Sequence, residues 1–118
     1  MPNQSDLMML RDKLRSFAAD RDWDQFHSPK NLSMALMVEV AELMEHFQWL
    51  TEAQSLDLAA KTKDAVSEEL ADILLYLVRL SDKLDVDLPK AALLKLEKNA
   101  AKYPAEQVRG SAKKYTEY

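Results

Sequence analysis

Cysteine is absent from this chain of 118 residues, and glycine occurs only once. Without cysteine there is no disulfide and no thiol chemistry, which suits a reducing compartment, and we expect a cytoplasmic protein. A single glycine leaves little for hairpin turns, dinucleotide-binding loops or P-loops, because all of these need residues that tolerate positive φ. The sequence therefore argues against an all-β fold and against a nucleotide site cradled by glycines.

Long apolar runs are also missing. Charged residues interrupt the first fourteen positions before the apolar segment of a secretory signal can form. The helix-like apolar run after Asp72 stops at Arg79, far short of the roughly 20 residues that a membrane span needs. We therefore expect no membrane partner. With 47% hydrophobic and 31% charged residues, the chain is expected to form a single folded domain over residues 1–118.

Charge of the two signs is unevenly placed along the chain. Residues 89–118 carry seven Lys/Arg and three Asp/Glu, whereas residues 1–88 carry nine and seventeen. An acidic body argues against a nucleic-acid polymer as partner. It suits a cation site beside an anion site, and residues 105–118 form a basic tail.

Apolar periodicity and turn residues predict an all-α fold with four helices. The second of these has its apolar positions spaced 4, 4, 3, 4 and 3 residues apart, and a Ser-Pro pair starts it. The predicted helices run from about Ser5 to Ala19, from Ser28-Pro29 to about Leu50, from near Thr62–Val66 to near Leu84, and from Asp87-Leu88-Pro89 to Tyr103-Pro104, with a loop at Asp20–His27 and a connector at 51–63 that has room for a helical turn at Ala53–Ala60.

Two of the predicted helices each carry a pair of carboxylates three residues apart, Glu39 with Glu42 and Glu69 with Asp72. On a helical wheel both pairs lie along the margin of the apolar stripe, so antiparallel packing would bring four acids together. Four converging carboxylates must be protonated, paired with lysines or bound to a divalent cation. One such pair commonly lies on a solvated helix margin, but two pairs in register favour a metal, Mg²⁺ first and Mn²⁺ second.

Magnesium held by carboxylates binds phosphate oxygens and activates water, so basic residues are expected nearby. The fourth predicted helix has a stripe of three lysines with Asn99 among them, and a lysine stripe alone would fit a solvated face equally well. Its lysines are Lys95, Lys98 and Lys102.

Several segments resemble the MazG-like nucleotide pyrophosphohydrolases, and within them the dCTP pyrophosphatase subgroup. The resemblance extends from about Arg21 to Glu117. It rests on RDWDQFHSPK at 21–30, EVAE at 39–42 with HFQW at 46–49, EELAD at 68–72, and KLEKNAAKYP at 95–104. Ala41 stands where the family has glycine.

This resemblance implies an all-α enzyme that splits a nucleoside triphosphate, dCTP or a modified dCTP, into a monophosphate and pyrophosphate with Mg²⁺. By the same resemblance Glu42, Glu69 and Asp72 are the metal ligands. Glu39 is either a ligand or the carboxylate that orients and deprotonates the attacking water.

The substrate-binding residues are also expectations from the resemblance. Aromatic and polar side chains would enclose the pyrimidine, His27 and Asn99 would read its edge, and Tyr76 would pack against the sugar. The residues expected around the base are Trp23, His27, Phe47 and Trp49, and Lys95, Lys98 and Lys102 are expected at the triphosphate. Core or interface packing is the ordinary explanation for either tryptophan taken alone.

The third predicted helix is apolar nearly all round, with Leu74, Leu75 and Val78 on the back of its main stripe. Such a helix must be buried on both sides, which predicts a homo-oligomer. The family forms dimers and tetramers, and we expect a homotetramer, a dimer of dimers. Its basic tail, with Tyr115 and Tyr118, would then lie over a neighbour's active site.

Two alternatives stay open at this point. The chain could be a pyrophosphatase of other canonical or damaged triphosphates, or a helical oligomerisation module without catalytic activity. A module of that kind has no reason to place Glu39 and Glu69 on its packing faces.

Overall fold

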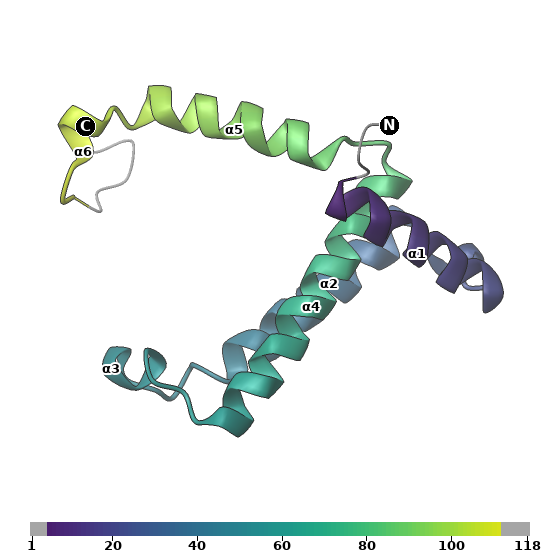
Figure 1. Ribbon diagram of the computed structural model, residues 1–118, viewed down its shortest axis with the longest axis horizontal. Coiled ribbons are helices and arrows are strands. Elements are labelled where there is room, and N and C mark those ends of the chain that lie inside the picture. Colours follow the sequence, from purple (N-terminus) through teal and green to yellow (C-terminus); the bar gives the residue numbers. More distant parts are fainter. Residues whose placement is uncertain (1–4, 112–118) are drawn as a thin grey trace. The chain divides into compact units, whose positions relative to one another are not determined.

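The structure, a computed structural model, describes residues 5–111, and each regular element in that range is a helix (Figure 1). The chain divides into two compact units, one ending at Asp85 and the other starting at Val86, and each unit is described by itself. The elements are α1 (Asp6–Asp20), the short 3₁₀ helix η1 (Asp24–Phe26), α2 (Pro29–Glu45), α3 (Glu52–Ser55) and α4 (Ala60–Lys83) in the first unit, and α5 (Leu88–Lys102) and α6 (Ala105–Val108) in the second.

Helix α1 begins at a serine cap and ends in a tight reversal. The Ser5 hydroxyl accepts a hydrogen bond from the Met8 amide at 3.1 Å, which satisfies one of the free donors of the first turn. After α1, Asp22 adopts φ 54°, a left-handed conformation that Asp tolerates better than most residues. The Trp23 amide then donates back to the Ala18 carbonyl at 2.9 Å. The segment predicted as a loop therefore folds back against α1 and contains η1.

Helix α2 starts as predicted, since Ser28 caps it and Pro29 occupies its first turn. The prediction that it continues to about Leu50 is wrong, because it ends at Glu45. Past that point the Phe47 amide bonds to the Met44 carbonyl and the Leu50 amide to the Phe47 carbonyl, three residues back. A capping box at Thr51 then opens α3.

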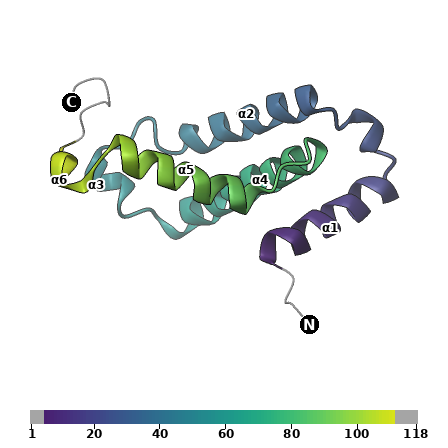
Figure 2. The ribbon, with the colours of Figure 1, turned by 90° about the horizontal axis from the view of Figure 1, so that it is seen from above.

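Helices α2 and α4 lie side by side and run antiparallel, as the two views show, and α1 also packs on α4 (Figure 2). Helix α4 starts at Ala60, slightly before the predicted start, and ends at Lys83. The core joins all three helices, and in the described part of the chain no helix is long and apolar enough to span a membrane. The buried apolar residues are Ala18, Leu32, Val66 and Val78.

The prediction that α4 is buried on both sides is met only in part within the single chain. Leu74 is exposed, whereas Val78 is buried and Leu75 lines a pocket. The reason is that α1 packs against this side of α4 within the same chain.

The second unit consists of α5 and α6. Asp87 caps α5 by accepting from the Lys90 amide. The helix ends at Lys102, and Tyr103, the residue before a proline, is its C-cap, close to the predicted end. Part of the predicted basic tail forms α6, followed by Gly110 at φ 77°. Residues 112–118 of that tail, including Tyr115 and Tyr118, lie outside the described residues.

Candidate active site

Three of the four predicted acids meet between α2 and α4. Glu39 of α2 and Glu69 and Asp72 of α4 each offer a carboxylate oxygen, and these oxygens lie within 4.8 Å of one another. The antiparallel packing of the two helices produces this convergence (Figure 2). Glu42 is not one of these three, but its carboxylate is close enough to act on Glu39 by charge and hydrogen bonding.

The cluster has the character of a cation site. The Oε2 atoms of Glu39 and Glu69 are buried, with no hydrogen-bond partner among the described residues. Burial, a hydrogen bond to Glu69, and the charges of Glu42 and Asp72 together raise the pKa of Glu39 to about 7. Buried carboxylate oxygens without donors are costly, and a divalent cation would remove that cost. An oxygen-only donor set fits a hard ion such as Mg²⁺.

A pocket of about 450 Å³ lies beside this cluster, within the size range of small-molecule sites. Asp72 belongs to both the cluster and the pocket wall. The wall is mostly apolar and is built by α1, α4, the segment between α1 and α2, and the first turns of α2. It is lined by Leu10, Lys13, Leu14, Phe17, Trp23, His27, Leu32, Asp72, Leu75, Tyr76 and Arg79.

The predicted base-binding residues divide into two groups. Trp23, His27 and Tyr76 line the pocket, and the Trp23 and His27 rings meet edge to face at 6.5 Å between centroids. Phe47 and Trp49 do not line it, because α2 ends before them. Trp49 is 86% exposed in the single chain.

The predicted triphosphate residues all lie on α5, in the second unit. The three lysines are exposed, and Asn99 is half-buried. The role of Lys95, Lys98 and Lys102 at the phosphates stays a prediction, as does the role of Asn99 of the same helix at the pyrimidine edge.

Sequence reasoning missed the contribution of α1 and of Arg79. The signal for α1 was its own apolar stripe, which supplies Leu10, Leu14 and Phe17 to the pocket. The signal for Arg79 was its position inside the apolar run of α4, where a charged side chain needs a buried partner. Arg79 is only 5% exposed.

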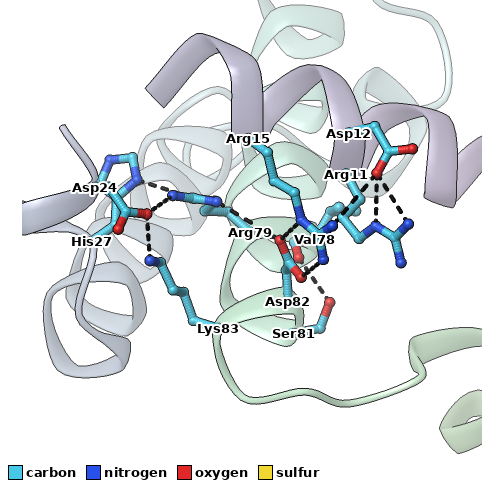
Figure 3. Close-up of polar contacts among 10 residues, drawn as sticks. All are labelled: Arg11, Asp12, Arg15, Asp24, His27, Val78, Arg79, Ser81, Asp82 and Lys83. Carbon is cyan, nitrogen blue, oxygen red and sulfur yellow. Dashed lines mark hydrogen bonds and ion pairs between the residues drawn. The ribbon is translucent and has the colours of Figure 1, made fainter. Parts of the chain in front are cut away.

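Arg79 is the centre of a polar network that joins α1, η1 and α4 (Figure 3). Its Nε donates to His27 Nδ1 at 3.1 Å and its Nη2 to Asp24 Oδ1 at 2.6 Å. Lys83 also pairs with Asp24, and Arg15 of α1 makes a two-pronged contact with Asp82 at 2.6 and 2.8 Å.

The charges of this network change the pKa values of its members. Burial and then the positive charges of Arg79 and Lys83 lower the pKa of His27, which favours its neutral ring. The hydrogen bond from Arg15 lowers the pKa of Asp82. The network therefore places a neutral imidazole in the pocket wall.

Comparisons with known proteins identify the family of the chain. The model of the MazG-like family matches residues 34–118. The dCTP pyrophosphatase 1 proteins of Rattus norvegicus and Homo sapiens are 50% and 48% identical to the chain over 103 residues, 86% of this chain and 61% of theirs. The chain thus spans about three fifths of the length of these relatives.

A solved structure supports the same assignment. The crystal structure of a pyrophosphatase from Archaeoglobus fulgidus DSM 4304 matches with a TM-score of 0.82 and 38% identity, over 88% of this chain and 97% of that one. The all-α fold and the resemblance are thereby confirmed. This chain belongs to the MazG-like family.

Proposed function

We propose that the chain is an enzyme that hydrolyses dCTP or a modified dCTP to the nucleoside monophosphate and pyrophosphate, as a housecleaning activity on the cytoplasmic nucleotide pool. The observation that carries this proposal is the carboxylate cluster, with two buried oxygens that lack donors, at the wall of an apolar pocket. The names of the relatives, dCTP pyrophosphatase 1 and a pyrophosphatase, support the reaction and the substrate.

The cluster would hold Mg²⁺, with Mn²⁺ as a substitute, through Glu39, Glu69 and Asp72. Glu42 is a further carboxylate that is close enough to act on Glu39. Such an ion neutralises charge on phosphate oxygens and lowers the pKa of a bound water. The raised pKa of Glu39 belongs to the metal-free cluster, because a bound cation would lower it again. In the cluster Glu39 would serve either as a ligand or as the carboxylate that orients and deprotonates the attacking water.

The pocket would hold the base and sugar. Trp23 offers an aromatic face for stacking, which binds any base. His27 would read the pyrimidine edge, and Tyr76, which lines the same pocket as Asp72, would pack against the sugar. The lysines of α5 remain our candidates for contacts with the triphosphate.

The test is a panel of nucleoside triphosphates with Mg²⁺, followed by identification of the products. We expect dCMP and pyrophosphate from dCTP. Release of orthophosphate would overturn cleavage between the α and β phosphates. An even rate over all bases would reject the preference for dCTP and favour the broader pyrophosphatase.

Two variants on neighbouring residues of α4 make this test specific to the cluster. Loss of an outer partner of a metal ligand typically costs about 10–100-fold, so we expect Glu69→Gln to lower kcat at least that much. Glu68→Gln changes the adjacent, exposed acid by the same chemistry and is expected to leave kcat unchanged. Equal effects of the two variants would argue against a role for the cluster.

We also propose that the protein assembles as a homotetramer, a dimer of dimers. The support is the apolar surface that the single chain leaves exposed on its helices, since large patches of this kind mark interfaces. Light scattering after gel filtration tests the assembly, and a monomer would overturn it. A tetramer that cleaves no triphosphate would favour the oligomerisation module. In the first unit the exposed apolar side chains include Met34, Met37 and Met44 on α2 and Leu70, Leu74 and Leu77 on α4, and in the second unit they include Leu93, Leu94 and Leu96 on α5.

A further inference from the structure

The buried guanidinium of Arg79 fixes the proton of a pocket histidine. An arginine side chain is always protonated and has donors but no acceptor. Because its Nε donates to His27 Nδ1, that ring nitrogen must carry the lone pair. In a neutral ring the proton then sits on Nε2. Figure 3 shows the imidazole with only Nδ1 turned toward Arg79.

The Nε2–H group that results has no hydrogen-bond partner among residues 5–111. His27 is half-buried and lines the pocket, and its ring meets that of Trp23 in an edge-to-face contact. The wall around it is predominantly apolar, so a donor there finds few competing groups in the protein. The pocket therefore has a directed donor for a ligand acceptor.

We propose that Arg79 is a positioning residue that holds His27 as the Nε2–H tautomer, so that the pocket presents a hydrogen-bond donor to the edge of its ligand. This inference rests on the proposed function in one respect, namely that the ligand is a pyrimidine base. Every pyrimidine base has an acceptor at O2, and cytosine has a second one at N3. The opposite tautomer would present a lone pair, which these acceptors repel.

The surrounding charges hold Arg79 in this orientation. Its Nη2 bonds to Asp24 on η1, and its Nη1 lies 3.7 Å from Asp82 on α4 itself. Lys83 and Arg15 give these two carboxylates cationic partners of their own. Replacing Arg79 therefore leaves neither acid unpaired, and we expect Arg79→Met to fold.

Imidazole ¹⁵N shifts of the full chain, measured by long-range ¹H–¹⁵N correlation near neutral pH, test the inference without substrate. We expect a single Nε2–H tautomer for His27 in the unaltered protein and a mixture of both tautomers in Arg79→Met. His46, which follows the end of α2, is an internal reference. Lys83→Met is the matched control, because it removes the other partner of Asp24 and is expected to keep the His27 signature.

An Nδ1–H tautomer or a mixture in the unaltered protein would overturn the proposal, as would an unchanged signature in Arg79→Met. The spectrum of the unaltered protein is sufficient to reject the proposed tautomer, so the proposal can be tested even if Arg79→Met fails to fold. If no triphosphate is cleaved but the tautomer is as stated, the proposed function fails and the role of Arg79 stands.

Kinetics then test the use of this donor. Loss of one neutral hydrogen bond is worth roughly three- to tenfold, so we expect Arg79→Met to raise KM for dCTP by about that factor with a smaller change in kcat. His27→Asn keeps an acceptor near Nδ1 and lacks the Nε2 donor, and it should raise KM likewise. His27→Gln brings an amide N–H toward the Nε2 position and should restore part of the affinity. Equal KM values for Asn and Gln would refute a directed donor.

Discussion

Replacing Glu39 by glutamine should stabilise the metal-free protein at the same time as it weakens the proposed metal site. Burial and three neighbouring acids raise the pKa of Glu39 from its ordinary 4.5 to about 7. The folded protein therefore binds this proton more tightly than the unfolded chain does. By linkage, stability falls as the pH rises between these two values, because the proton must then be given up. Glutamine has the shape of the protonated acid and carries no charge.

The size of the effect follows from the two pKa values. One pKa unit corresponds to about 1.36 kcal/mol, so the raised pKa represents at most about 3 kcal/mol above pH 7. Glu39 is only half-buried, and solvent screens part of this repulsion. We therefore expect Glu39→Gln to raise the free energy of unfolding by about 1–2 kcal/mol at pH 8, a gain that shrinks steadily toward pH 4.

Urea unfolding at fixed protein concentration in EDTA measures this difference, and Glu45→Gln, an exposed acid at the end of α2, is the control that should change nothing. Addition of Mg²⁺ should reverse the order of stability. At a hundredfold excess over Kd it stabilises a binding protein by about 2.7 kcal/mol, and Glu39→Gln should gain far less. A Glu39→Gln protein no more stable than the unaltered one at pH 8 without metal would refute the reasoning.

Three further outcomes are expected. Leu32→Ala, which truncates a side chain only 1% exposed, should lower the free energy of unfolding in urea by about 2–5 kcal/mol. Ser28→Ala should cost about 1 kcal/mol in the same assay, because it removes the cap of α2. Arg15→Met should make the stability of the protein less dependent on acidic pH. Because Arg15 lowers the pKa of Asp82, this pair stabilises the fold above the ordinary aspartate pKa, and the stabilisation is lost as the pH falls. Thermal unfolding from pH 6 to 3 should therefore show a smaller loss of stability in the variant than in the unaltered protein.

The start of α2 and the register of the acids could be predicted from local chemistry. The adjacent residues Ser28 and Pro29 are typical of the start of a helix, and in the structure Ser28 caps α2 as expected. The pairs on α2 and α4 were placed by helical period alone, and antiparallel packing then brings Glu39, Glu69 and Asp72 together. Because an α-helix turns by a nearly constant angle per residue, the residues that share one of its faces can be predicted from their spacing in the sequence.

The end of α2 could not be predicted in this way. Leu43, Phe47 and Leu50 continue the apolar spacing past Glu45, and no glycine or proline marks the stop. The helix gives way to three-residue turns that lead into the capping box of Thr51. Apolar periodicity indicates which side chains share a face of a helix. It does not reveal a change in backbone hydrogen bonding when the residues that follow are still apolar at the same spacing.

The role of Arg79 was hidden for a different reason. Its partners Asp24 and His27 lie more than fifty residues earlier in the chain, in a segment that reads as an irregular loop. Only the reversal after α1, with Asp22 in a left-handed conformation, brings that segment onto α4. Long-range pairing of this kind depends on the tertiary fold and leaves no periodic trace in the sequence.

Helix α4 carries four groups of the first unit's candidate site on one face, an arrangement that would set the direction of a bound ligand. Glu69, Asp72, Tyr76 and Arg79 follow one another at spacings of 3, 4 and 3 residues, which keeps them on one side of the helix. With a rise of 1.5 Å per residue the stripe is about 15 Å long, a span that suits a nucleotide laid lengthwise. Its acidic end can hold phosphates only through a cation, whereas its Arg79 end offers a donor through His27. Variants at the acidic end should therefore act mainly on kcat, and those at the Arg79 end mainly on KM.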